Sequence, residues 1–269
     1  MSRGRVLIVA GSDSGGGAGL QGDVKTVTVL GGHAATAVTA ITVQNTLGVE
    51  AVHMLPPDLV AAQIRAVLTD IGADAIKIGM LGNAGVITAV ADALDGTDAP
   101  IVLDPVMIAK GGARLLDDGA VGALMERLLP RATVVTPNAP ELAALTGLPA
   151  GNEDEAQRAG HALAKLGTAV VVKGGHLPDD PELGMADRLI VAGEFEVTLR
   201  APRVDTPHTH GTGCALASAI ACGLAQGMGL AAAFRRAHAF VGAAIRAAPG
   251  LGGGHGPLGF LEGASALDD

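Results

Sequence analysis

The segment His210-Gly211-Thr212-Gly213-Cys214 places two glycines, a threonine and a thiol directly before the apolar, alanine-rich run Ala215–Ala221. Glycines let the backbone turn sharply, so several N–H groups at a helix start can converge on one anion. The helix dipole adds about half a positive charge at that point. We therefore predict a phosphate site here, with Cys214 biased toward the thiolate. The alternative is a tight turn before a core helix, in which Cys214 is a small buried apolar residue.

Further residues have the chemistry that phosphoryl transfer needs. No Gly-x-x-x-x-Gly-Lys-Ser/Thr sequence occurs, which excludes a P-loop enzyme, but a metal-holding carboxylate and a phosphate cradle are still required. Asp104, before Pro105, and Glu141 are the candidate metal ligands. Asn138 can be a helix N-cap and Glu141 a first-turn acid, and these roles can coexist with a role in the site. Lys173, which ends an apolar strand before two glycines, either contacts phosphate or ribose or extends to water.

The segment Gly17-Ala18-Gly19-Leu20-Gln21-Gly22 matches a dinucleotide fingerprint by its letters. The match is weak, because the predicted strand ends about seven residues too early and no acidic residue follows about twenty residues later. We interpret the segment as a loop over a flat ligand, with Asp23 as a hydrogen-bonding carboxylate. Alternatively, Asp23 complements the helix dipole. His208 and His210 have no third ligand spaced nearby, so zinc is not expected.

Composition limits the possible partners and the setting. The 269 residues carry a net charge of −9 and include no tyrosine or tryptophan. Basic residues do not cluster, so nucleic acid and membranes are not expected partners. Cys214 and Cys222 are separated by about 12 Å along one predicted helix, too far for a disulfide. Unpaired thiols and the lack of a signal peptide predict a cytoplasmic setting. The apolar stretch 214–234 is broken by Gly227 and Gly229 and predicts a buried helix, not a membrane span.

Strands and helices are predicted to alternate along the chain. The predicted strands are Arg5–Ala10, Ala34–Val43, Ala75–Ile78, Ile101–Leu103, Thr133–Thr136, Ala169–Lys173 and Arg188–Val191. The predicted helices are 20–30, 57–71, 84–94, 117–129, 139–145, 153–166, 213–226 and 230–247. Several strands are apolar on both faces, as in parallel sheets covered by helices on both sides. We predict one α/β domain over residues 1–269, with 250–269 as a loose C-terminal extension.

Ligands of such sheets bind beyond the carboxyl ends of the strands. Polar or glycine residues follow nearly every predicted strand, namely Gly11–Gly17, Gln44-Asn45, Gly79-Met80, Asp104-Pro105, Pro137-Asn138 and Gly174–His176. The sequence therefore predicts one rim that holds the site.

These segments together resemble a known family. The resemblance rests on Gly11–Gln21, Thr39–Thr46, Lys77–Leu81, Asp104–Met107, Thr136–Glu141, Val172–His176 and His210–Cys214. In this order they are similar to the hydroxymethylpyrimidine/phosphomethylpyrimidine kinases of thiamine biosynthesis, from about residue 5 to 247. The resemblance implies a ribokinase-like three-layer sandwich with a mostly parallel sheet, a homodimer, and the cofactors ATP and Mg²⁺. It also implies transfer of phosphate first to the hydroxymethyl group of the pyrimidine and then to the resulting monophosphate.

The resemblance further implies roles for individual residues. Gln44 reads the pyrimidine edge with Asp23, and the pocket is lined by Gly11, Ala18, Val43, Met80 and Met107. Gly211, Thr212, Gly213 and Cys214 hold phosphate, with Cys214 where related kinases carry an aspartate base. Asn138, Lys173 and Lys110 contact the nucleotide, Asp104 and Glu141 hold the metal, and 107–112 form a lid.

Three alternatives stay open from the sequence. A pyridoxal kinase of the same fold is the nearest, although the lid region carries Lys110 in place of the cysteine implied by that group. A Rossmann-type oxidoreductase would depend on Gly17–Gly22. A non-catalytic nucleotide-binding module would leave Cys214 and Glu141 without a task.

Overall fold

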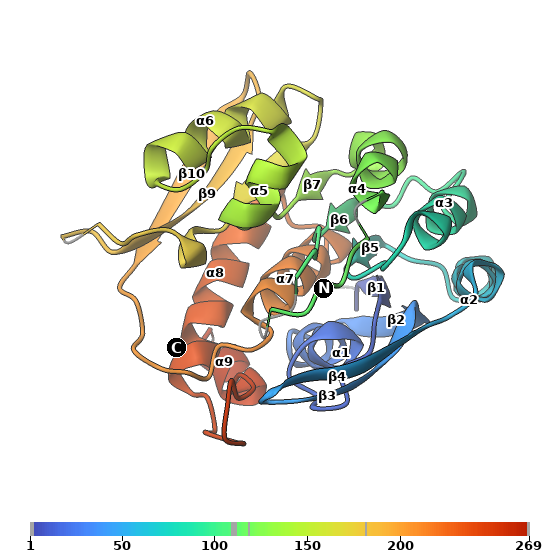
Figure 1. Cartoon of the computed structure of the whole chain (residues 1–269), viewed down its shortest axis with the longest axis horizontal. Coiled ribbons are helices and arrows are strands. Elements are labelled where there is room, and N and C mark those ends of the chain that lie inside the picture. Colours follow the sequence, from blue (N-terminus) through green and yellow to red (C-terminus); the bar gives the residue numbers. More distant parts are fainter. Residues whose placement is uncertain (1–2, 109–111, 118, 181, 268–269) are drawn as a thin grey trace.

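The computed structural model describes residues 3–108, 112–117, 119–180 and 182–267. An eight-stranded sheet runs through it in the order β10-β9-β8-β7-β6-β5-β1-β2 (Figure 1). Its strands are β1 (Arg5–Ala10), β2 (His33–Val38), β5 (Ala75–Ile78), β6 (Ile101–Leu103), β7 (Val134–Val135), β8 (Ala169–Val172), β9 (Met185–Val191) and β10 (Phe195–Ala201). The pairings from β2 to β8 are parallel, and β9 is antiparallel to both neighbours. The predicted mostly parallel sheet is confirmed.

Helices cover both faces of this sheet. Leu7 and Val9 of β1 pack in the core formed with α2 (Pro57–Asp70), α3 (Ala84–Ala93), α5 (Ala139–Thr146) and α6 (Glu153–Ala164). Val6 and Ile8 pack in a second core with α1 (Gly19–Val29), α7 (Thr212–Ala225), α8 (Leu230–Arg246) and α9 (Phe260–Ser265). Successive side chains of a strand point to opposite faces, so the unbroken apolar run of β1 fits a sheet buried on both sides.

The predicted strand Ala34–Val43 is wrong as one element. After β2, the strand β3 (Ala40–Asn45) leaves the main sheet and pairs with β4 (Gly48–Met54), which was not predicted. Thr39 marks the break, because its N–H donates to the Ala10 carbonyl and its hydroxyl to the Met80 carbonyl, at 3.0 and 2.7 Å. These bonds turn the chain across the carboxyl ends of β1 and β5. Gln44 of β3 is thereby held beside the loop after β1, where the Ser14 hydroxyl donates to its carbonyl at 2.6 Å.

Several other elements differ from the prediction. The helix predicted over 117–129 is α4 (Ala120–Ala123), followed by a π-helical turn over Leu124–Leu128 and a 3₁₀ turn over Leu129–Arg131. Pro130 has no N–H to continue an α-helical ladder, which agrees with the change of helix type. A further 3₁₀ turn, Gly174–His176, follows β8, and β10 was not predicted.

The C-terminal segment is packed, so the prediction of a loose extension is wrong for the described part of residues 250–269. Leu258 and Phe260 are buried in the second core. Gly263 lies directly against Ala244 of α8, where a larger residue would not fit. Pro257 forms a β-bridge with His210, which ties this segment to the start of α7.

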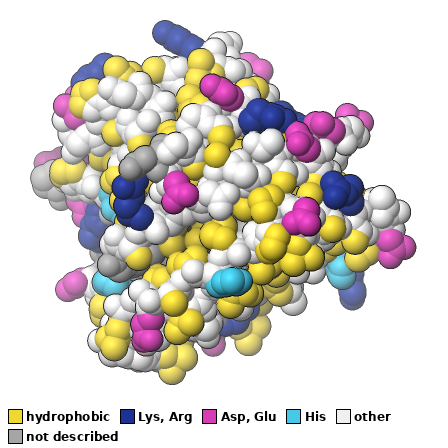
Figure 2. Space-filling view, turned by 45° about the vertical axis from the view of Figure 1, so that its right-hand side comes forward, with side chains coloured by type: hydrophobic (Ala, Val, Ile, Leu, Met, Phe, Trp, Pro, Cys, Tyr) yellow, Lys and Arg dark blue, Asp and Glu magenta, His cyan; other side chains and the backbone are white. Residues whose placement is uncertain are grey.

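None of the helices in the described residues is long and apolar enough to cross a membrane. The stretch 214–234 begins with α7, most of which is buried in the second core, as predicted. On the face shown in Figure 2, basic side chains are scattered among acidic ones and do not gather into a patch.

Candidate active site

A cavity of about 1280 Å³ lies at the carboxyl ends of β1, β5, β6 and β8. Among the described residues that line it are thirteen of the sixteen predicted site residues, namely Gly11, Ala18, Gln44, Met80, Asp104, Met107, Asn138, Glu141, Lys173, Gly211, Thr212, Gly213 and Cys214. Loops from distant parts of the chain thus meet at one rim, as expected for a parallel sheet.

The three exceptions have different causes. Asp23 is fully buried, with one carboxylate oxygen 2.7 Å from the Lys77 ammonium and the other accepting from the Ser218 hydroxyl at 2.7 Å. The prediction that Asp23 contacts the substrate is therefore wrong, and it is not in the first turn of α1 either. The side chain of Val43 does not line the cavity and is 53% exposed, because it alternates with Thr42 and Gln44 on β3. Lys110 lies outside the described residues.

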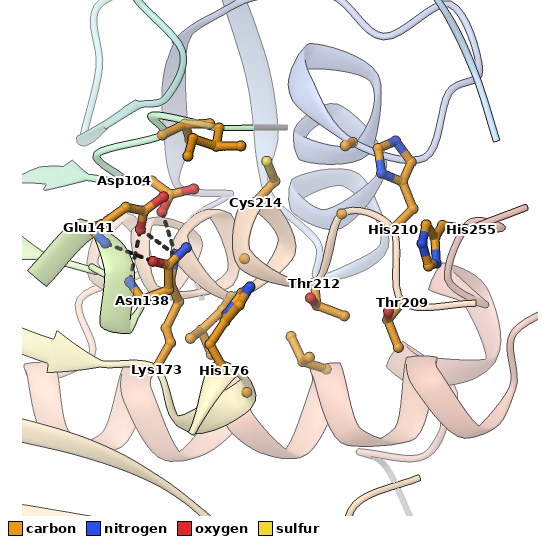
Figure 3. Close-up of a pocket in the computed structure, with 18 of the residues that line it drawn as sticks. Asp104, Asn138, Glu141, Lys173, His176, Thr209, His210, Thr212, Cys214 and His255 are labelled. Atoms are coloured by element: carbon orange, nitrogen blue, oxygen red, sulfur yellow. Dashed lines mark hydrogen bonds and ion pairs between the residues drawn. The ribbon is translucent and has the colours of Figure 1, made fainter. Parts of the chain in front are cut away.

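The start of α7 has the sharp turn that the glycines predict. Gly211 is the N-cap with φ of 88°, and a Cβ there would overlap the Gly17 carbonyl. Only glycine fits such a left-handed, crowded position. Cys214 follows in the first turn of the helix, between the Asp104–Lys173 cluster and His210 (Figure 3). A Cβ on Gly213 would lie 3.1 Å from the Lys173 ammonium, so the helix start and this cation face the same space.

The predicted bias of Cys214 toward the thiolate is wrong. Burial raises the pKa of the thiol to about 11, although the Lys77 ammonium opposes this. A low dielectric favours the neutral thiol, and here burial outweighs the opposing effect of the Lys77 ammonium. The resting group at the start of α7 is therefore a protonated thiol.

Asp104, Glu141 and Lys173 form a buried charged cluster at one end of the cavity (Figure 3). The Lys173 ammonium lies 2.8 Å from Asp104 and 3.6 Å from Glu141. Asn138 caps α5 by accepting from the Glu141 N–H at 2.9 Å, while the Glu141 carboxylate accepts from the Asn138 N–H at 2.8 Å. The capping alternative is therefore correct, and it fixes the carboxylate of Glu141 beside Lys173.

The pKa values of these two carboxylates shift in opposite directions, because burial and ion pairing have different weights for each. For Asp104, the effect of burial is outweighed by Lys173 and Lys77, which hold its pKa below the ordinary value. For Glu141, burial dominates and raises the pKa despite Lys173. Burial lowers the pKa of Lys173, but Asp104 and Glu141 outweigh that effect and raise it, so its ammonium stays charged. The cluster is thus held together by one cation shared between two carboxylates.

Lys77 is a site residue to which the sequence analysis gave no role. Its side chain is 0% exposed, contributes to the cavity lining and is paired with Asp23. Burial lowers the pKa of Lys77, yet Asp23, Cys214 and Asp104 outweigh that effect and raise it. A lysine flanked by isoleucines in a strand with no exposed face was the signal that could have identified it.

The other end of the cavity contains Gln44, Met80 and a histidine that was not predicted to contact ligand. His210 Nε2 lies 2.8 Å from the Asp13 carboxylate and 3.2 Å from the Gln44 carboxamide. Asp13 is buried and also accepts from the N–H groups of Gly15, Gly17 and Ala18 at 2.8–3.0 Å. One carboxylate therefore shapes the glycine-rich loop and holds His210 against the cavity.

A third part of the cavity was missed by the sequence analysis. It is lined by Pro202, Val204, Asp205, Val241, Ile245 and Arg246, from the segment after β10 and from α8. These residues carry no recognisable motif, and β10 itself was not predicted, so no sequence signal pointed to them.

Comparisons with known proteins agree with this geometry. The structure superposes on an ADP complex of *Bacillus subtilis* pyridoxal kinase with a TM-score of 0.88 and 34% identity, covering 99% of this chain and 100% of that one. It superposes on a phosphomethylpyrimidine kinase from *Clostridium difficile* with a TM-score of 0.78 and 36% identity, covering 90% and 99%. The fold is therefore that of the ribokinase-like kinases, which are phosphotransferases.

Sequence comparison narrows the class. The sequence model of the family described as phosphomethylpyrimidine kinase matches residues 13–259. The hydroxymethylpyrimidine/phosphomethylpyrimidine kinase of *Streptomyces coelicolor* is 50% identical over 254 residues, which are 94% of this chain and 93% of that protein. This chain belongs to the phosphomethylpyrimidine kinase family.

Proposed function

We propose that this protein uses ATP and Mg²⁺ to phosphorylate 4-amino-5-hydroxymethyl-2-methylpyrimidine to its monophosphate and then to the diphosphate, in thiamine diphosphate biosynthesis. The observation that carries the proposal is the arrangement of one cavity. Lys173 and His210 lie on either side of Cys214 (Figure 3). Gln44, 3.2 Å from His210, and Met80 line the same cavity and offer a less charged end for a ring. The relatives' names and the family support the same reaction.

Phosphate would bind between the start of α7 and Lys173. The N–H groups after Gly211 and the Lys173 ammonium face the same space, as the 3.1 Å approach to a Cβ on Gly213 indicates. Two independent positive sources then act on the transferring phosphoryl group. Thr212 and Asn138 line the cavity there and would contact the nucleotide.

The residues at the charged end fit a magnesium ion. Asp104 and Glu141 offer buried carboxylate oxygens, the hard ligands that Mg²⁺ takes, and their present shared partner is the Lys173 ammonium. Sites of this kind use one or two carboxylates and complete the shell with phosphate oxygens and water. When bound, Mg²⁺ would neutralise phosphate charge and orient the phosphates.

Cys214 would take the proton of the acceptor alcohol in the first phosphorylation. An alcohol is a poor nucleophile until its proton leaves, whereas a phosphate monoester is already anionic near neutral pH. The thiol must first release its own proton to solvent water, which the Lys77 ammonium favours, and the resulting thiolate then takes the proton of the alcohol. We therefore propose that Cys214 matters more for the first step than for the second.

The direct test is incubation of the protein with Mg-ATP and hydroxymethylpyrimidine, followed by mass spectrometry. We expect the monophosphate to appear first and the diphosphate after it. Pyridoxal in a parallel reaction tests the alternative that the likeness to pyridoxal kinase favours. Faster turnover of pyridoxal than of the pyrimidine would overturn the proposed substrate.

We also propose a homodimer. Ile41, Val43 and Leu47, at the β3–β4 pair, are 48%, 53% and 75% exposed. A contiguous exposed apolar patch of this kind is typical of an interaction surface. Light scattering after size-exclusion chromatography should give twice the chain mass, and Val43→Lys should shift it toward the monomer.

A further inference from the structure

Asp13, His210 and Gln44 form a hydrogen-bonded chain behind the ring-binding end of the cavity. Asp13 and His210 are 2% and 8% exposed, and His210 Nε2 is the atom that both Asp13 and Gln44 approach. The chain therefore joins a buried anion to the side chain that would read the pyrimidine. The donor and the acceptor of each of its hydrogen bonds can be assigned.

The first link is fixed by Asp13. Its carboxylate accepts three backbone N–H groups in addition to the imidazole. Burial alone would raise the pKa of Asp13, but the bonds from His210 and from the Ala18 N–H outweigh it and lower the pKa. An ionised carboxylate only accepts, so His210 Nε2 carries the proton of this bond.

The second link follows from the first. The Gln44 carboxamide atom nearest His210 lies 3.2 Å from a nitrogen that donates. A half-turn of the carboxamide exchanges its oxygen and its nitrogen. Nε2 has a single N–H, which points to Asp13 at the shorter distance, and only the oxygen of Gln44 can share it, as the weaker acceptor of a three-centre bond.

The neighbouring Thr42 requires the same orientation of the Gln44 carboxamide. Its hydroxyl donates to the Ser12 carbonyl at 2.9 Å, so it can only accept from the Gln44 carboxamide at 3.4 Å. The atom of Gln44 on the Thr42 side must then be the nitrogen. The two neighbours, one on either side, agree on a carbonyl toward His210 and an amide nitrogen toward Thr42.

We propose that Asp13 and His210 are positioning residues that fix the direction of the Gln44 carboxamide and so determine which way round the substrate ring binds. This inference rests on the proposed function. A carboxamide pairs with the aminopyrimidine edge by accepting from the 4-amino group and donating to N3. The amino group then lies on the His210 side and the 2-methyl group on the Thr42 side. Because the 5-hydroxymethyl group is next to the amino group, it also lies on the His210 side, toward Gly211–Cys214. The opposite direction of Gln44 would place it away from Cys214.

The test compares two substrates that differ only in which groups at C4 and N3 of the pyrimidine donate and accept hydrogen bonds. One is the 4-amino compound and the other its 4-oxo analogue, which presents an N3–H donor and a C4 carbonyl acceptor. The fixed carboxamide can pair with the analogue only when the ring is turned over, which moves the hydroxymethyl group to the wrong side. We expect the wild type to prefer the amino compound by about 100-fold in kcat/KM.

Three variants test whether His210 causes this preference. His210→Leu removes the donor and frees Gln44 to turn, so we expect the preference to fall by about tenfold or more, with the 4-oxo analogue gaining activity relative to the 4-amino compound. His210→Gln keeps an N–H at the same reach and should retain the preference within about threefold. His208→Leu is the matched control, since His208 lies two residues away and does not line the cavity. Each ratio is measured on one preparation, so loss of folded protein cancels.

An unchanged preference in His210→Leu, or loss of it in His208→Leu, would overturn the inference. The wild type gives a second measurement by nitrogen-15 NMR of the histidines, in which His210 should carry a proton on Nε2. A neutral His210 protonated on Nδ1 alone would also overturn it. Failure of the wild type to phosphorylate either compound would instead overturn the proposed function, and the NMR result would still decide the direction of Gln44.

Discussion

The two ends of the cavity offer different kinds of interaction to a ligand. At the charged end, three carboxylates (Asp23, Asp104 and Glu141) and two ammonium groups (Lys77 and Lys173) lie within side chains that are at most 13% exposed. At the ring end, Gln44 and Thr42 contribute neutral donors and acceptors, and the nearby Asp13 carboxylate accepts from three backbone N–H groups and from His210.

The two ends therefore favour different ligand groups. The charged end has one more carboxylate than it has ammonium groups, so it is suited to a further cation and, through Lys173, to phosphate. Charges attract from any direction, whereas hydrogen bonds between neutral groups discriminate by direction. We therefore expect substitutions at the charged end to cost stability or rate heavily, and substitutions at the ring end to change selectivity at smaller cost.

The largest expected effect is on stability, from Lys77→Met. This change leaves the Asp23 carboxylate buried and unpaired, which should lower the free energy of unfolding in urea by about 3–5 kcal/mol. The double variant Lys77→Met/Asp23→Leu should recover much of the loss, because an apolar pair needs no charge partner. The matched control Arg127→Met breaks an ion pair with Asp92 whose partners are 43% and 57% exposed, and it should cost about 1 kcal/mol or less. Equal costs in the two single variants would contradict the account.

The next effect is on rate, from Lys173→Met. We expect kcat/KM for the pyrimidine to fall about 10²–10³-fold, since a preorganised cation at the transferring phosphoryl group is lost. Lys165→Met, at an exposed lysine after α6, is the control and should leave the rate unchanged. A loss under tenfold for Lys173→Met would mean that the helix start binds the phosphate alone.

A third prediction concerns the pH dependence of the thiol between the two ends. Because the pKa of Cys214 is raised from 9.0 to about 11, the folded protein should hold about a hundredfold less thiolate at pH 8 than an ordinary cysteine. Alkylation by iodoacetamide, in a Cys222→Ser background, should therefore keep rising up to about pH 11. An inflection of the alkylation rate at or below pH 9 would show that the nearby cations outweigh burial in setting the pKa of Cys214.

The smallest effect is expected at the ring end, from Thr42→Val. The isosteric change removes the hydroxyl that orients the nitrogen side of Gln44, and a hydrogen bond of this kind contributes about 0.5–1.5 kcal/mol. KM for the pyrimidine should rise about threefold to tenfold with kcat nearly unchanged, as steady-state kinetics would show. A fall in kcat with constant KM would place Thr42 in the chemical step instead.

Much of the fold could be predicted because it depends on local patterns. The run Val6–Val9 is apolar at every position, and Asn138 with Glu141 gives a capping box, so both elements formed as expected. Thr39 could not be predicted as a break in the strand, since its hydrogen bonds reach two distant loops. The packed C-terminal segment was missed for a similar reason, because its glycines fit against α8 only in the folded chain.

The site could be predicted as a set of residues but not in its energetics. Thirteen of the fifteen predicted site residues that the structure describes line one cavity, since strand ends in a parallel sheet converge. The burial of Asp23 depends on its pairing with Lys77, which lies far from it in the sequence. The raised pKa of Cys214 is an effect of burial in the folded chain, which the Lys77 ammonium opposes. His210 was passed over because the sequence does not show that Asp13 faces it.

The most direct test of the account is the effect of Cys214→Ala on the two phosphorylations, each measured separately with saturating Mg-ATP. We expect kcat for the hydroxymethylpyrimidine to fall about a hundredfold or more, as for loss of a general base, while kcat for the monophosphate changes much less. Equal losses in both steps would contradict it and leave Cys214 as a packing or phosphate-binding residue.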